Sequence, residues 1–167
     1  MSRTPLLAAL LIAGCHSFGA PPLPGGVSRI DLVRTEDRPG VDVDAAAELG
    51  TALRRRLLAV RTEALASASE GSDGELVVEV IDVKTALAPL SDPSRRAGEY
   101  RADLTISGRL LRRDGHVAWS SAPVVGSANY YSVPGGIESL DGQRRAALAR
   151  AADDAARQLI DALYYAP

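Results

Sequence analysis

Hydrophobic and polar residues alternate most regularly in the segment "YRADLTISGRLL", residues 100–111. A period of two is typical of a strand with one face in a core and the other in water. The residues of the first face are Tyr100, Ala102, Leu104, Ile106 and Leu110, and those of the second are Arg101, Asp103, Thr105, Ser107 and Arg109. Gly108 interrupts the apolar series and is a candidate β-bulge. We therefore expect a half-buried strand with a polar, open face.

Three further segments have the composition of strands. Residues 27–34 and 75–86 are rich in Val and Ile. Asp114-Gly115 stands between two strand patterns and is a strong hairpin signal. The return strand then runs from His116 to Tyr131. Because Pro123 cannot donate to a ladder, this strand is expected to be an edge strand or to be bulged there.

Two segments have helical spacing. Leu49, Leu53 and Leu57 form one stripe in a helix expected over residues 45–65. A longer helix is expected over residues 138–164, with a stripe formed by Leu148, Ala152, Ala155, Leu159 and Leu163. The resulting order, β-α-β-β-β-α, predicts an α+β fold. We expect a two-layer sandwich, in which a four-stranded sheet carries both helices on one face.

The amino terminus combines Arg3, an apolar run over residues 6–13, and the sequence Leu11-Ile12-Ala13-Gly14 before the only cysteine, Cys15. The run is too short to span a bilayer and has the layout of a secretory signal. Its end is typical of a bacterial lipobox, in which the cysteine becomes acylated. We therefore predict a lipoprotein signal peptide at 1–14, an acylated Cys15 with a Pro/Gly-rich tether at 15–26, and a single domain at 27–167. His16 favours sorting to the outer membrane.

Catalytic chemistry finds little support in the remaining residues. The net charge of −2 lacks the basic excess that is typical of nucleic-acid-binding proteins. Asp153 and Asp154 diverge on a helix and cannot chelate a metal together. His116 with Ser120 or Ser121 is the one arrangement that resembles an esterase, and it lacks a nucleophile elbow. We expect a non-enzymatic protein without a metal site or a cofactor, and keep the esterase as an alternative.

Arginines and tyrosines are the candidates for binding. Arg95 and Arg96 precede the alternating strand, whereas Arg112 and Arg113 stand at the hairpin. If these loops lie together they form a positive patch for phosphates or carboxylates; otherwise the arginines are ordinary solvated residues. Tyr130-Tyr131 ends the return strand, and the two rings are equally typical of an interface and of a lid over the edge of a core.

The chain resembles the lipopolysaccharide-assembly lipoprotein family, LptE-like, over nearly its whole length. The matching features are Gly14-Cys15 with Phe18, Glu99-Tyr100 at a strand start, Tyr130-Tyr131, and the closing segment "AARQLIDAL" at 155–163. The resemblance implies a lipid-anchored protein on the periplasmic side of the outer membrane. Such a protein plugs a β-barrel translocon and presents lipopolysaccharide to it.

The resemblance also assigns roles to particular surfaces. The family's lipid-binding basic patch falls by position on Arg95 and Arg96. The polar strand face, with Arg101, Asp103, Thr105 and Arg109, would meet the polar lumen of the barrel. A rival interpretation is a periplasmic accessory lipoprotein of another secretion or envelope complex, because the same small fold would serve there.

Overall fold

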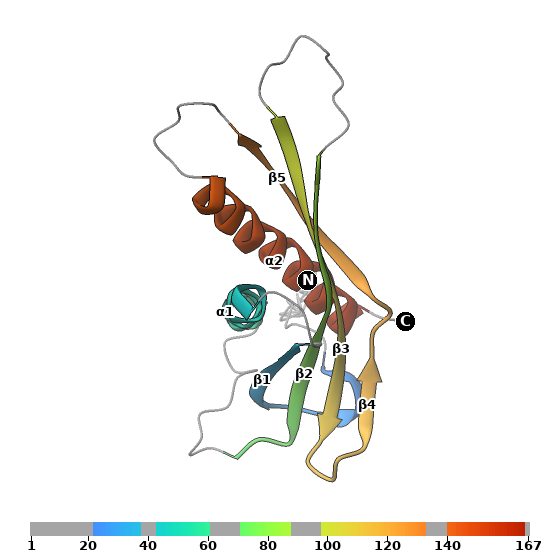
Figure 1. Cartoon of the computed structure of the whole chain (residues 1–167). Helices are drawn as coiled ribbons and strands as arrows, with labels where there is room; N and C mark the ends of the chain where they lie inside the picture. Colours follow the sequence, from blue (N-terminus) through green and yellow to red (C-terminus); the bar gives the residue numbers. More distant parts are fainter. Residues whose placement is uncertain (1–21, 38–42, 61–70, 88–97, 133–139, 166–167) are drawn as a thin grey trace, which may run out of the picture.

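A computed structural model describes residues 22–37, 43–60, 71–87, 98–132 and 140–165. The elements are a 3-10 turn η1 (Pro24–Gly26), β1 (Ile30–Asp37), α1 (Val43–Val60), β2 (Gly74–Leu87), β3 (Gly98–Arg112), β4 (Val117–Ser120), β5 (Val124–Ser132) and α2 (Leu140–Tyr165). Both helices lie on one side of the twisted sheet (Figure 1). The expected α+β sandwich is therefore confirmed.

The sheet is mixed, with β1 parallel to β2 and the other pairs antiparallel. The order is β1-β2-β3-β4, and β5 also pairs with β3. Strands β4 and β5 lie one after the other along the same edge of β3, opposite its last and first residues respectively. The sheet thus has four positions, as expected, but five strands.

The extra strand arises from the interruption around Pro123, which confirms the expected irregularity there. The break is bridged because the Ser121 N–H donates to the Gly108 carbonyl, and the Gly108 N–H donates to Ser121 Oγ, both at 2.9 Å. Gly108 makes no bulge toward β2, because it is in register with Val78 and the β2–β3 register shift lies between Val80 and Asp82. Toward the edge strands the expected irregularity is present, because Arg109 pairs with Ser120 and Ile106 with Val124, which leaves one extra edge residue opposite Gly108. A Cβ at Gly108 would lie 3.0 Å from Leu159 Cδ1, so the glycine leaves room for α2.

The core lies between the sheet and the two helices. On β3, Ala102, Leu104, Ile106 and Leu110 are all buried, which confirms the alternation. The α2 stripe, from Leu148 to Leu163, is buried as well. Among the described glycines, Gly126 of β5 has the least room, because a Cβ there would lie only 2.1 Å from the Ala151 carbonyl oxygen of α2.

The outer edge of β5 is occupied by side chains of α2. Gln158 donates to the Val125 carbonyl at 3.0 Å, Asp154 accepts from the Ser127 N–H at 3.2 Å, and Arg150 donates to the Asn129 carbonyl at 2.9 Å. The three helix residues are spaced four apart, so they form one row along the strand. Satisfying the edge in this way blocks addition of a further strand.

The chain enters the domain earlier than the sequence suggests. Leu23 and Val27 are buried, and η1 stands where an extended tether was expected. The Asp73 carboxylate accepts hydrogen bonds from the backbone N–H groups of Ser28 and Arg29, at 2.7–3.0 Å. Burial alone would raise the pKa of Asp73, but these backbone hydrogen bonds outweigh it and hold the pKa below its usual value. These hydrogen bonds hold the backbone at Ser28 and Arg29 against Asp73, and so fix where the chain enters the domain.

Candidate binding surfaces

The sheet face turned away from the helices, here called the open face, is polar. The residue pairing of β2, β3 and β5 shows which side chains share this face. Its charged and polar members are Arg34, Glu36, Glu75, Glu79, Asp82, Lys84, Arg101, Asp103, Thr105, Ser107, Arg109, Ser127, Asn129 and Tyr131. Of the residues predicted for this surface, Arg101 and Arg109 are exposed and Asp103 and Thr105 are half-buried. The predicted placement of these four residues on one face is therefore confirmed, whereas their binding role stays a prediction.

One network on the open face joins β3 to β5. Arg101 Nε donates to Asp103 Oδ1 at 2.7 Å, and Arg101 Nη2 donates to Ser127 Oγ at 2.8 Å. The Ser127 hydroxyl in turn donates to Asp103 Oδ1 at 2.6 Å. Burial would raise the pKa of the Asp103 carboxyl, but the hydrogen bonds from Ser127 and Arg101 outweigh burial and lower it. The carboxylate is thus held charged and oriented.

A second network lies toward β1. Arg34 contacts Glu36 and Glu75 at 3.2 and 3.3 Å, and Arg109 lies 3.9 Å from Glu36. Val77 stands between these arginines in register with both and is only 2% exposed, although it belongs to the open face. The arginine stems therefore cover an apolar position while their charged ends remain in water.

The two terminal tyrosines of β5 have different environments. Tyr130 is 5% exposed and stacks on Tyr100, with ring centroids 5.3 Å apart. Tyr131 is 44% exposed, and its hydroxyl donates to Glu99 at 3.1 Å. The assignment of Tyr130 to a binding surface was wrong, because strand alternation turns that ring into the core. Tyr131 alone stays a candidate.

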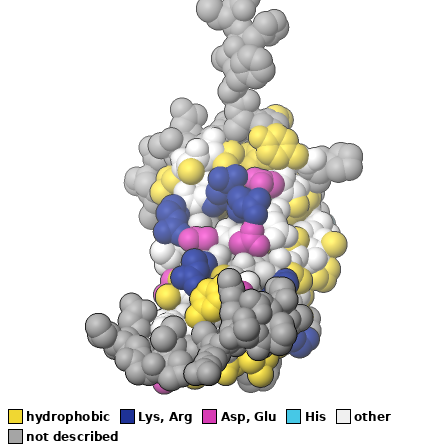
Figure 2. Space-filling view, turned by 90° about the horizontal axis from the view of Figure 1, so that it is seen from above, with side chains coloured by type: hydrophobic (Ala, Val, Ile, Leu, Met, Phe, Trp, Pro, Cys, Tyr) yellow, Lys and Arg dark blue, Asp and Glu magenta, His cyan; other side chains and the backbone are white. Residues whose placement is uncertain are grey.

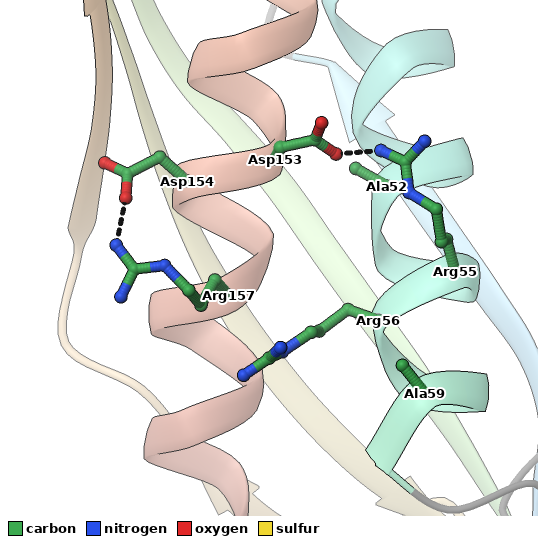
Figure 3. A pocket seen from close by; sticks show the side chains of 7 residues that line it. All are labelled: Ala52, Arg55, Arg56, Ala59, Asp153, Asp154 and Arg157. Atoms are coloured by element: carbon green, nitrogen blue, oxygen red, sulfur yellow. Dashed lines mark hydrogen bonds and ion pairs between the residues drawn. The ribbon is translucent and has the colours of Figure 1, made fainter.

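A shallow groove of about 450 Å³ runs between α1 and α2 (Figure 3). Arg55 pairs with Asp153 across the groove, and Arg56 reaches Asp161 at 3.0 Å. Asp154 points the other way, toward Arg157 (Figure 3). The adjacent aspartates thus diverge as expected. The groove is closed by ion pairs between the two helices, so we assign it a structural role.

The structure describes only one of the two arginine pairs considered for a positive patch, Arg112 and Arg113. Arg95 and Arg96 lie outside the described residues, just before β3 starts at Gly98, and Arg112 is its last residue. Because the structure does not describe the first pair, the joint patch stays a prediction. Cys15 also lies outside the described residues, and its acylation stays a prediction.

Signs of charge are mixed elsewhere on the surface. Seen from above, basic side chains lie beside acidic ones (Figure 2). Within the described ranges, no group of three or more His, Cys, Asp or Glu is arranged to hold a metal ion. In the same ranges, neither helix is long and apolar enough to cross a membrane.

Comparison with known proteins gives a family and a fold. The family described as LptE, lipopolysaccharide-assembly, matches residues 29–163. A lipoprotein from Caulobacter crescentus CB15 shares 18% identity with a TM-score of 0.53, over 79% of this chain and 87% of that chain. A minor lipoprotein from Acinetobacter baumannii shares 16% identity with a TM-score of 0.50, over 79% of this chain and 89% of that chain. At these identities the solved structures show the fold alone. No protein of curated function matches the chain.

Proposed function

The chain belongs to the lipopolysaccharide-assembly family, LptE, and on this premise we propose that it is a non-enzymatic lipoprotein of the outer membrane. In this proposal Cys15 carries the acyl chains and the domain occupies the lumen of a β-barrel translocon from the periplasmic side. There it assists the assembly of lipopolysaccharide. The single observation that carries the proposal is the family match over residues 29–163.

The chemistry of the open face supports a barrel as the partner. Large outer-membrane barrels have a polar interior. The charges on the open face are already paired with one another, as in the network of Arg101, Asp103 and Ser127. A surface whose charges are already paired therefore leaves fewer unpaired charges when a polar lumen encloses it than a surface with isolated charges would.

The size of the domain restricts which barrels can hold it. Four strand positions about 4.8 Å apart make the sheet about 20 Å wide, and the helix layer adds about 10 Å of thickness. Barrels of 16–18 strands enclose only an aqueous channel, whereas barrels of about 22 strands hold a folded plug. We therefore propose a partner of at least about 22 strands.

Co-purification tests the proposal directly. The tagged full-length chain is expressed, outer membranes are solubilised in detergent, and bound proteins are identified. We expect a large barrel protein that is recognised by its different migration before and after boiling. Recovery of soluble periplasmic proteins or an inner-membrane complex in its place would favour the accessory-lipoprotein interpretation.

A matched pair of variants locates the contact. Thr105 lies on the open face of β3, in register with Asp82 and Val125, so Thr105→Arg adds bulk and charge where the barrel wall would be. Ala146→Arg makes the same kind of change on the exposed side of α2. We expect Thr105→Arg to reduce barrel recovery and Ala146→Arg to leave it unchanged, with similar melting temperatures for both.

The same preparation tests the other parts of the proposal. Metabolic labelling with palmitate is expected to tag the chain through Cys15 and to fail in Cys15→Ser. Hydrolysis of simple esters that disappears in His116→Ala would contradict the non-enzymatic assignment. Binding of lipopolysaccharide is expected to weaken in Arg95→Glu with Arg96→Glu, without loss of thermal stability.

A further inference from the structure

Most arginines of the described segments are engaged by other residues, but three guanidinium groups make no hydrogen bond or ion pair with another described residue. These are Arg54, Arg112 and Arg113. By contrast, Arg34, Arg101 and Arg109 on the open face all have acidic partners. Arg112 and Arg113 are adjacent, so two positive charges stand together at one end of the sheet, and neither forms an ion pair with a described residue.

Two hollows flank these arginines. One, of about 380 Å³, is lined by both arginines and by Glu75 and Leu111, among others. The other, of about 260 Å³, is lined by both arginines and by Gly25, Gly26, Val27, Asp73 and Asp114.

The acidic residues in the hollows are already occupied. Asp73 accepts from the backbone N–H groups of Ser28 and Arg29, Glu75 pairs with Arg34, and Asp114 accepts from the His116 N–H. Asp73 and Asp114 keep their negative charge, since their donors are neutral backbone groups, but neither forms an ion pair with Arg112 or Arg113. The guanidinium N–H donors of both arginines are therefore open to an external anion.

This end of the domain is also where the tether enters. A Cβ at Gly25 would lie 2.7 Å from Ala118 Cβ and 3.1 Å from the Arg112 guanidinium, so η1 packs directly on the hairpin. The described chain starts at Pro22, seven residues after Cys15. Seven residues reach at most about 25 Å. The opposite end, marked by Leu87, is thirteen residues of β2 beyond Gly74, or about 43 Å farther.

We propose that this end, called the anchor end and formed by Gly25, Gly26, Arg112, Arg113 and Val117, rests on the phospholipid headgroups of the leaflet that holds the acyl chains. Arg112 and Arg113 bind lipid phosphates, for which the guanidinium fork is well suited. Val117, which is 57% exposed beside them, provides an apolar contact at the interface. The inference rests on the proposed acylation of Cys15 and adds to it a defined orientation.

The test uses the acylated full-length chain in vesicles of phosphatidylethanolamine and phosphatidylglycerol. Because acylation consumes the native thiol, a cysteine introduced at Val117→Cys or Leu87→Cys can be labelled alone with a fluorescent dye. Both positions are exposed. A nitroxide on the lipid headgroup quenches only nearby dyes. We expect quenching at position 117 to exceed that at position 87 severalfold, and to decrease as salt is raised.

Arg113→Gln and Arg54→Gln provide a matched comparison, because each removes one arginine without a described partner. Each arginine near an anionic surface strengthens attachment by about fivefold. We expect Arg113→Gln to lower the quenching at position 117, the double change with Arg112→Gln to lower it further, and Arg54→Gln to leave it unchanged. Melting temperatures of all variants show whether they remain folded.

The outcomes separate the orientation from the anchor. Vesicle-bound protein with equal quenching at both positions, or with equal effects of Arg113→Gln and Arg54→Gln, overturns the orientation alone. If the anchor end faces a protein partner, the dye at 117 stays unquenched in protein-free vesicles, which also overturns it. Protein that does not float with the vesicles contradicts the acylation itself, and with it both proposals.

Discussion

Among the described glycines, Gly126 is the one at which an added methyl group should be most damaging. A Cβ there would lie 2.1 Å from the Ala151 carbonyl oxygen, 2.4 Å from the Ala155 nitrogen and 2.7 Å from Ala155 Cβ. Two of these atoms belong to the backbone of α2 and cannot rotate away. Gly126→Ala therefore requires the whole helix to move away from β5.

The size of the loss in the free energy of unfolding follows from this movement of the helix. Real Cβ contacts below 3.0 Å are essentially absent, so the shift is about 1 Å or more. Overpacking of a core costs about 1–3 kcal/mol. The shift also strains the three hydrogen bonds from Arg150, Asp154 and Gln158 to the edge of β5, each contributing about 0.5–1.5 kcal/mol. We expect a loss of about 4 kcal/mol in the free energy of unfolding, and a melting temperature lower by about 10–15 °C.

Gly50→Ala is the matched control. Gly50 lies inside α1, and its nearest neighbour would be Thr35 Cγ2 at 3.6 Å, an ordinary contact distance. Replacing a glycine in a helix interior by alanine stabilises by up to about 1 kcal/mol. Urea unfolding of the two variants should therefore give changes of opposite sign. If Gly126→Ala unfolds within about 0.5 kcal/mol of the wild type, the close packing of α2 on β5 is refuted.

Three shorter predictions concern other residues. Because the pKa of Asp73 is lowered in the folded state, its carboxylate contributes stability above its unfolded pKa of 3.8. The free energy of unfolding of the wild type should therefore exceed that of Asp73→Asn near pH 6. This difference should vanish as the pH falls below 3.8 through the folded pKa. Asp154→Ala leaves the Ser127 N–H on the β5 edge without its acceptor, so we expect a loss of about 1–2 kcal/mol and concentration-dependent self-association, measured by ultracentrifugation. Tyr130→Leu should destabilise by about 1–3 kcal/mol through lost stacking and burial, whereas Tyr131→Leu should unfold like the wild type in urea.

The elements themselves could be predicted from local patterns. Alternation identified both faces of β3, helical spacing identified the buried stripe of α2, and Asp114-Gly115 identified the hairpin, where Gly115 has a φ of 82°. These features depend on neighbours in sequence. The parallel pairing of β1 with β2 could not be predicted, because it depends on contacts between residues more than forty positions apart, such as Ile30 and Gly74.

The sequence contained a pattern that indicates the burial of Tyr130 and the polar row on α2. In "VVGSANYY" the period of two places Tyr130 with Ala128 and Val124 on the inward side, which separates it from Tyr131. The four-residue spacing of Arg150, Asp154 and Gln158 likewise indicates one polar row on α2, although not which strand it serves. Leu23 had no such signal, because one apolar residue among prolines and glycines shows no period; only the packed structure reveals that it is 2% exposed.

The two proposed surfaces require different things from their surroundings. On the open face, Arg101 and Arg109 are neutralised by Asp103 and Glu36, so a partner that encloses this face is selected mainly by shape. At the anchor end, Arg112 and Arg113 form no ion pair with a described residue, so their guanidinium donors are open to an anionic partner. Salt screens exposed charges more strongly than enclosed pairs. Raising the ionic strength should therefore release the anchor end from headgroups before it releases the domain from a barrel.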